Sequence, residues 1–292
     1  MTRKNDLPLW GWWILPLFSL LAACSASPSV RQEKAKLKWE ALATASNFQY
    51  EAIQTRIFRL STYQKIKSPY QPLTIYIEGD GRSWISRTQL STNPTPRNPL
   101  ALKLALLDPS ANVAYLARPC QYTPLSLDKA CTPIIWSDKR FSESVIQSMN
   151  EAVEVLKLKA RAKKIHLVGF SGGAAVAALI ASRREDVASL RTVCGDLDHV
   201  MLSHYHQTTP LVGSLNPRSI AKTLRHLPQQ HFVGEKDLIV PSFIAQAFIT
   251  QMAKYGPHCA RQTVLKEATH HKGWEHAWKI LLNEPLSCTA GL

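Results

Sequence analysis

Strand-like and helix-like segments alternate along this chain from residue 72 to its C-terminal region. The first strand-like run, PLTIYI at 72–77, is continuously apolar and rich in β-branched residues, which is typical of a strand buried on both faces. The expected strands are 72–81, 112–119, 164–170, 189–195, 230–237 and 261–268, and the expected helices are 98–109, 141–160, 172–185, 217–226, 241–255 and 274–283. This alternation predicts a mostly parallel sheet with helices on both faces, within a single α/β domain.

The residues upstream of this pattern divide into two parts. Residues 48–68 alternate apolar and polar side chains, as two half-buried strands do. Residues 24–47 begin with a run of small residues, and the helical spacing over 31–46 is mostly polar. We therefore expect 24–47 to be a linker and tether with its helix outside the core, and 48–292 to be the folded domain.

The first 23 residues have the features of an export signal. Arg3 and Lys4 precede an apolar run over 7–23 that ends in small residues. The motif Leu-Ala-Ala-Cys at 21–24 resembles the lipobox of bacterial lipoproteins, and this resemblance implies a signal peptide over 1–23 and acylation of Cys24. An ordinary signal peptide or an uncleaved anchor stays open, because the apolar run is just long enough to span a bilayer.

The expected cellular location and the net charge of the chain limit the classes of partner that it can bind. Ser25, rather than Asp, follows the cysteine, which resembles lipoproteins sorted to an outer membrane. We expect a lipid-anchored protein of the bacterial cell envelope, facing the periplasm if the source is Gram-negative. The formal net charge is +14, but the Lys and Arg residues are scattered and an exported chain rarely meets nucleic acid, so we expect no such partner. The charge suits an anionic lipid surface, or is a solvated basic surface.

Five cysteines remain after Cys24, and an oxidising compartment permits disulfides. We expect Cys120 to pair with Cys131 across a short loop, and Cys259 to pair with Cys288 so that the last helix is tied down. Cys194 lies in a strand-like run and is expected to be a free core thiol. Other pairings of the four loop cysteines stay open.

A serine stands between glycines where an expected strand meets an expected helix. Gly169-Phe170-Ser171-Gly172-Gly173 follows KIHLVGF and precedes an alanine-rich helix, which is the setting that gives G-x-S-x-G its meaning. The sharp turn exposes the Ser171 hydroxyl to a base, and the Gly172 N–H is free to meet an oxyanion. The alternative is that this Gly-Ser turn has no catalytic role and only allows the helix to pack closely against the strand.

A serine nucleophile needs a base and an orienting acid, and both follow in the expected order on loops after later strands. Asp237 follows one strand-like run, and His270 and His271 follow the next. Asp196 and Asp198 are rival acids, one strand earlier. An Asp at the start of a helix is also stabilising by itself, which is the alternative role for Asp237.

With these motifs, the chain resembles the α/β-hydrolase superfamily, in its esterase- and lipase-like form, over most of 48–285. GEKDLIVP at 234–241 is similar to the acid loop of that superfamily, and the spacing in EATH at 267–270 favours His270 over His271. The resemblance implies a second oxyanion N–H after the strand at 72–77.

The loop that should supply this second N–H departs from the superfamily. It reads Glu78-Gly79-Asp80-Gly81, where many hydrolases have His-Gly. We assign the Asp80 N–H, with Gly81 as second choice, and expect Arg82 or Arg118 to pair with the added negative charge.

Two further loops each allow more than one interpretation. Residues 195–206 hold several Asp and His residues whose spacing fits no zinc pattern, so we expect a polar rim rather than a metal site. Residues 118–136 form a long connection at the sheet edge where ligands bind, and either line the substrate site or only pack. The insertion over 196–216 is short, which predicts no large cap domain and an open site.

The sequence therefore predicts a membrane-anchored serine hydrolase, of α/β-hydrolase fold, that cleaves a carboxylic-ester-type bond. Its triad is Ser171, His270 and Asp237, and it needs no metal or organic cofactor. The substrate is a small-molecule or lipid ester, with thioesters and peptides left open, and we expect a monomer. The alternative is a catalytically inactive hydrolase-fold lipoprotein that acts as an envelope binding module.

Overall fold

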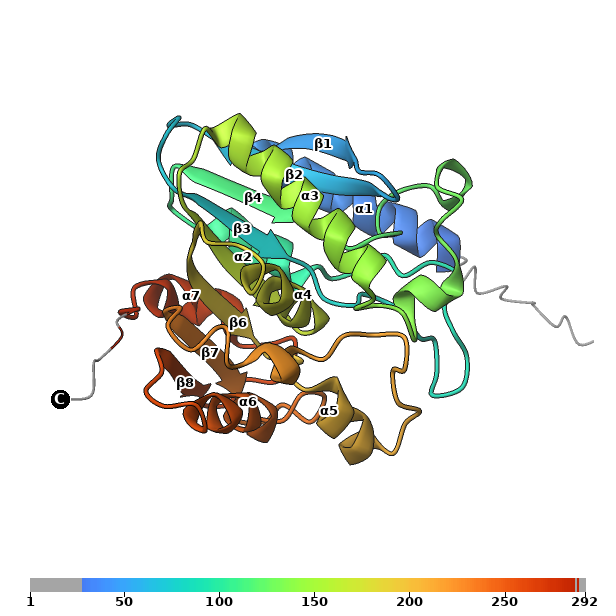
Figure 1. Ribbon diagram of the computed structural model, residues 1–292. Coiled ribbons are helices and arrows are strands. Elements are labelled where there is room, and N and C mark those ends of the chain that lie inside the picture. The colour runs from blue at the N-terminus through green and yellow to red at the C-terminus, as the bar shows by residue number, and fades with distance from the viewer. Residues whose placement is uncertain (1–27, 287, 289–292) are drawn as a thin grey trace, which may run out of the picture.

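The computed structural model describes residues 28–286 and 288, and its centre is an eight-stranded sheet (Figure 1). The strand order is β1-β2-β4-β3-β5-β6-β7-β8. The strands are β1 (Gln49–Gln54), β2 (Arg59–Ile66), β3 (Leu73–Ile77), β4 (Asn112–Leu116), β5 (Ile165–Phe170), β6 (Val187–Val193), β7 (Gln229–Gly234) and β8 (Ala260–Leu265). Strand β2 is antiparallel to both β1 and β4, whereas the strands from β4 to β8 are parallel to their neighbours. The predicted mostly parallel sheet is confirmed.

Helices cover both faces of the sheet. The helices are α1 (Pro28–Ala45), α2 (Leu100–Leu107), α3 (Glu143–Ala160), α4 (Gly172–Ala181), α5 (His199–His206), α6 (Phe243–Ala253) and α7 (Trp274–Leu282). Helices α3, α4 and α6 contribute to one buried apolar cluster, and α1, α2 and α7 to the other. Two separate clusters on one sheet are what a layered α/β domain requires.

The helix expected outside the core is part of it, so that expectation is wrong. In α1, Trp39 and Ala43 are buried in the second apolar cluster. The Trp39 Nε1–H donates to the carbonyl of Arg97 at 3.0 Å. These two residues are one helical turn apart and are the two buried residues described in α1, so a narrow stripe is enough to attach the helix.

Two other segments differ from expectation. Residues 199–206, expected to be irregular, form α5, because the Asp198 side chain accepts from the N–H of Met201 and caps the helix. The helix expected over 217–226 is limited to a 3₁₀ turn, Pro217–Ile220. No helix among the described residues combines the length and the apolar content that a membrane span requires.

Both expected disulfides are present, and Cys194 is a buried free thiol. Cys120–Cys131 closes the loop after β4, and Cys259–Cys288 ties the segment after α7 to the start of β8.

Removing the first disulfide should destabilise the fold measurably. Cys120→Ser/Cys131→Ser is expected to lower the free energy of unfolding by about 2–4 kcal/mol, since the bond closes a loop of 11 residues in the unfolded chain. Urea unfolding under non-reducing conditions measures this change. Reductant should then destabilise the wild type more than the variant, and equal responses would contradict the expectation.

Candidate active site

The turn at Ser171 has a backbone that its glycines make possible. Ser171 has φ 51° and ψ −122°, and it stands between the end of β5 and the start of α4. Its N–H donates to the carbonyl of Val193 at 2.9 Å. A Cβ on Gly169 would lie 2.4 Å from Ala174 Cα, and one on Gly173 would lie 2.3 Å from the Ile77 carbonyl oxygen. Neither contact can be relieved by a side-chain rotation, so both positions require glycine.

The structure brings Ser171, His270 and Asp237 into one hydrogen-bonded chain. His270 Nδ1 lies 2.8 Å from Asp237 Oδ2, and His270 Nε2 lies 3.0 Å from Ser171 Oγ. An ionised carboxylate can only accept, so Nδ1 carries the proton and Nε2 is free to accept from the serine hydroxyl. This is the arrangement that lets a histidine take a proton from a serine.

The acid is held as a carboxylate. Its other oxygen, Oδ1, accepts from the N–H groups of Ile239 and Val240 at 2.8 and 2.9 Å. Burial acts to raise the pKa of Asp237, but the hydrogen bond and charge of His270 outweigh it, so that the pKa is lowered. The buried Cys194 thiol also donates to this carboxyl.

The alternatives to these residues occupy other positions. The ring of His271 packs at right angles to that of His270 and is exposed, whereas His270 contacts Ser171. Asp198 pairs with Arg218 at 2.9 Å. Asp196 is buried, and burial raises its pKa to about 7. The histidine bond therefore belongs to Asp237.

The loop after β3 lies directly on the nucleophile turn. A Cβ on Gly79 would be 3.2 Å from Ser171 Cβ. Neither the Asp80 N–H nor the Gly172 N–H has a hydrogen-bond acceptor among the described residues. Gly81 has φ 65°, and a Cβ there would lie 2.1 Å from the Pro94 carbonyl oxygen, which accepts from the Arg82 N–H. The two N–H groups assigned from sequence thus remain available beside Ser171.

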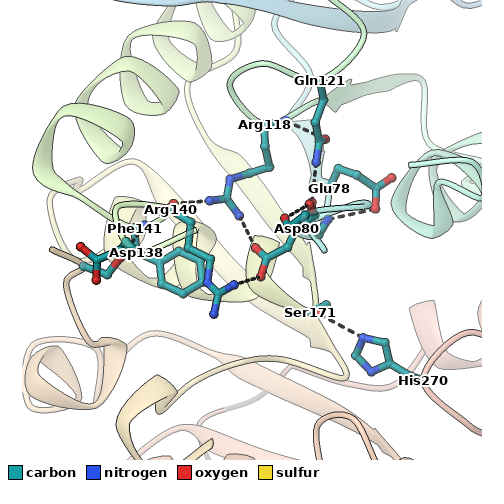
Figure 2. A network of polar contacts seen from close by, with 12 residues as sticks. Glu78, Asp80, Arg118, Gln121, Asp138, Arg140, Phe141, Ser171 and His270 are labelled. Carbon is teal, nitrogen blue, oxygen red and sulfur yellow. Dashed lines mark hydrogen bonds and ion pairs between the residues drawn. The ribbon is translucent and has the colours of Figure 1, made fainter. Parts of the chain in front are cut away.

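The Asp80 carboxylate is neutralised by two arginines (Figure 2). Arg118 Nη1 lies 3.2 Å from Oδ1, and Arg140 Nη1 lies 3.3 Å from Oδ2. Both guanidinium groups also stack on the ring of Phe141. Arg118 is one of the two partners expected for Asp80, but Arg140 was not expected. It comes from a loop before α3 that has no recognisable motif.

A second unexpected residue supports the same loop. Gln121 Nε2 donates to the Gly79 carbonyl at 2.9 Å, and Gln121 Oε1 accepts from the Arg118 N–H at 3.2 Å (Figure 2). Its neighbour Cys120 is fixed by the disulfide to Cys131. The loop over 118–136 therefore supports the loop after β3, which is expected to supply the second oxyanion N–H.

Glu78 is buried and points away from the nucleophile. Its Oε1 accepts from the Gly79 N–H at 2.9 Å, and the N–H groups at the start of α2 face it as well. Burial raises its pKa to about 7 against these hydrogen bonds.

This raised pKa predicts a pH-dependent stability. The folded state holds the Glu78 proton up to about pH 7, whereas the unfolded chain releases it near the ordinary glutamate pKa of 4.5. The contribution of Glu78 to stability is therefore greatest below the lower value, and it falls by about 3 kcal/mol as pH rises through the interval. Glu78→Gln should flatten this decline in urea unfolding between about pH 5 and pH 8. The surface variant Glu235→Gln should keep it, and an unchanged slope in Glu78→Gln would contradict the assignment.

The described residues hold one group of side chains close enough to suggest a metal site. The ligand atoms of Cys194, Asp237 and His270 lie within 4.8 Å of one another. Burial, followed by the charge of Asp237, raises the pKa of the Cys194 thiol well above its ordinary value, so it keeps its proton. The hydrogen bonds among the three account for the group, and we assign it no metal.

Comparison with known proteins identifies the fold. No family model and no curated protein sequence matches the chain. An esterase of Pyrococcus furiosus is similar in structure, with a TM-score of 0.55, 14% identity, and coverage of 82% of this chain and 91% of that one. A serine hydrolase homologue from Coxiella burnetii gives 0.52, 16%, 80% and 93%, and a bacterial membrane phospholipase A gives 0.56, 12%, 87% and 92%. The chain has the α/β-hydrolase fold, as its sequence motifs predict.

Proposed function

We propose that this protein is a serine hydrolase that cleaves carboxylic-ester-type bonds through an acyl-enzyme. The observation that carries the proposal is the chain of contacts from Asp237 through His270 to Ser171, with two available N–H groups beside the serine. The similarity of the fold to that of esterases and a phospholipase is consistent with it.

Each residue has one role in the reaction. Ser171 Oγ attacks the ester carbonyl carbon as its proton passes to His270 Nε2, and Asp237 holds the imidazolium. The N–H groups of Gly172 and Asp80 donate to the oxyanion. His270 then gives the proton to the leaving alcohol as the acyl-enzyme forms. Water, deprotonated by the same histidine, attacks this intermediate and releases the acid and Ser171.

The ion pairs of Asp80 with Arg118 and Arg140 make its backbone N–H compatible with an oxyanion. A lone carboxylate there would oppose the negative charge that develops on the substrate oxygen. Arg118 and Arg140 offset that charge, and the guanidinium of Arg118 is almost fully buried. The N–H of Asp80 can therefore serve while its side chain is held by the two arginines.

We also propose that the protein is exported, anchored in the cell envelope through acylated Cys24, and monomeric. Cys24 and the signal peptide lie outside the described residues. Residues 196–216 hold only the short helix α5 and a loop, which supports an open site without a large cap.

Hydrolysis of p-nitrophenyl esters by the wild type and by Ser171→Ala tests the proposed function. The wild type should release nitrophenol in a burst of about one equivalent before steady turnover, because the acyl-enzyme accumulates when its hydrolysis is slow. Ser171→Ala should show neither phase. Equal rates for the two proteins would contradict the proposal.

One observation favours the alternative, an inactive hydrolase-fold binding module. The Asp80 carboxylate lies so close to the nucleophile turn that a Cβ on Gly172 would be 2.0 Å from Oδ1. A folded wild type that hydrolyses no ester, thioester or peptide would support this module.

A further inference from the structure

The active site and the N-terminal end of the described chain lie at the same edge of the sheet. Strand β1 is antiparallel to β2, which is antiparallel to β4, so β1 runs in the direction of the parallel strands. Helix α1 ends just before β1, and the Phe48 N–H donates to the Ala43 carbonyl at 2.9 Å. The end of α1 is therefore at the amino edge of the sheet, and its beginning is at the carboxyl edge.

Helix α1 is long enough to extend from the carboxyl edge of the sheet to its amino edge. Its 18 residues span about 27 Å. On the way Trp39 contacts Arg97, which lies in the loop between β3 and α2 at the carboxyl edge. Figure 1 shows the first turn of α1 on the right, on the side to which β3 and β4 point. Pro28 thus shares an edge with Ser171, which follows β5.

Four exposed apolar side chains lie on loops at this edge. The apolar rim, as we name it, consists of Trp84, Val212, Leu238 and Ile239. Val212 (89% exposed) and Leu238 (75% exposed) are the two most exposed large apolar side chains of the described residues.

Each part of the apolar rim is connected to the active site. Leu238 and Ile239 directly follow Asp237. Trp84 follows Ser83, whose hydroxyl donates to the Asp80 carbonyl at 2.7 Å. Next to Val212, the Gly213 N–H donates to Asp138, two residues before the Arg140 that pairs with Asp80. The rim residues therefore lie on loops that carry or contact the candidate site.

The charge of this edge is suited to anionic lipid. Arg82, Arg87 and Lys139 form no ion pair with any described residue. The Arg87 guanidinium donates to the carbonyl of His206, the last residue of α5. Exposed apolar side chains together with cations that form no ion pair are typical of a surface that rests on anionic headgroups.

The sequence before α1 also favours a membrane at this edge. The apolar run over 7–23 ends immediately before Cys24, which stands four residues before Pro28. Four residues reach at most about 14 Å, so a membrane-bound segment upstream would hold the edge near the bilayer.

We propose that the carboxyl edge of the sheet docks on the anionic bilayer to which the chain is anchored, and that ester lipids of this bilayer are the substrate class. This inference rests on the proposed hydrolase function for the substrate, but not for the docking surface. In the docked state the apolar rim enters the interface, and the ester group reaches Ser171 without leaving the membrane surface.

A kinetic comparison tests the substrate class. The full-length protein is reconstituted in vesicles of phosphatidylcholine and phosphatidylglycerol, and it is given either a lipid ester in the vesicle or soluble p-nitrophenyl acetate. Leu238→Ser should lower the ratio of vesicle to soluble hydrolysis by about tenfold, because one leucine no longer enters the interface. The matched control is Leu158→Ser, which removes a leucine of similar exposure at the amino edge and should keep the ratio.

A fluorescence measurement tests the docking surface without any catalysis. Val212→Cys and Leu158→Cys are each labelled with an environment-sensitive dye, since Cys194, the free thiol of the described residues, is buried and Cys24 is acylated in the proposed anchored form. In the same vesicles the dye at residue 212 should shift to the blue and be quenched by nitroxide-labelled lipid, whereas the dye at 158 should not.

The outcomes separate the two proposals. If neither ester is hydrolysed, the proposed function fails, and the dye alone decides the docking surface. If the soluble ester is hydrolysed but Leu238→Ser keeps the wild-type ratio, the lipid substrate class is overturned. If the dye at residue 212 stays in water, as it would on a surface for a protein partner, the docking proposal is overturned.

Discussion

Alanine in place of His270 is expected to lower kcat by roughly four to six orders of magnitude, because the serine would lose the base that takes its proton. His270 Nε2 is 3.0 Å from Ser171 Oγ, and no other described histidine contacts that oxygen. Steady-state hydrolysis of a p-nitrophenyl ester measures the loss. Circular dichroism and thermal unfolding show whether the variant is still folded.

The adjacent histidine provides the matched control. His271 packs against both His270 and Phe170 but forms no hydrogen bond with Ser171. His271→Ala should therefore keep kcat within about tenfold of the wild-type value. Any loss within that range would come from a small change in the position of His270. A large loss in His271→Ala with little change in His270→Ala would reverse the assignment of the base.

Alanine in place of Gly173 is expected to destabilise the fold by more than about 4 kcal/mol, or to prevent folding. Its Cβ would lie 2.3 Å from the Ile77 carbonyl oxygen and 2.5 Å from that of Glu78. Both are backbone atoms of the strand end that carries the oxyanion loop, so relief would require α4 to move away from β3. Urea unfolding and the yield of folded protein measure the effect.

Gly213 is the control for this prediction. A Cβ there would meet only the flexible side chains of Asp138 and Lys139, each at 2.7 Å. Gly213→Ala should therefore cost less than about 1 kcal/mol. If the two variants were equally stable, α4 would not be packed against β3 as the structure has it.

The pattern of the sheet and the order of the three chemical residues could be predicted from sequence because each depends on local signals. Strand β5, Ser171 and α4 lie in one short segment whose glycines are required by a single sharp turn. Asp237 and His270 each follow a strand, and parallel strands bring their ends to one edge. Their contact with Ser171 is a consequence of that topology.

Arg118 was one of the partners expected for Asp80, but the rest of the support of the loop after β3 could not be predicted, since it comes from side chains far along the connection between β4 and α3. Arg140 and Gln121 reach Asp80 and Gly79 only after the chain has folded. The packing of α1 could not be predicted either, because Trp39 and Ala43 are the two buried residues described in a helix whose other residues are mostly polar. Both the support of this loop and the packing of α1 depend on contacts between residues far apart in the sequence. Such contacts cannot be predicted from the pattern within one segment.

Labelling with a fluorophosphonate probe tests the central claim most directly. The probe reacts with a serine only when a neighbouring base activates it, so the reaction reports the Ser171–His270 pair without any assumption about substrate. The full-length wild-type protein in detergent should take up about one equivalent of probe on Ser171, and folded Ser171→Ala should take up none. A folded wild type that stays unlabelled, or a Ser171→Ala variant that is labelled equally, would contradict the account.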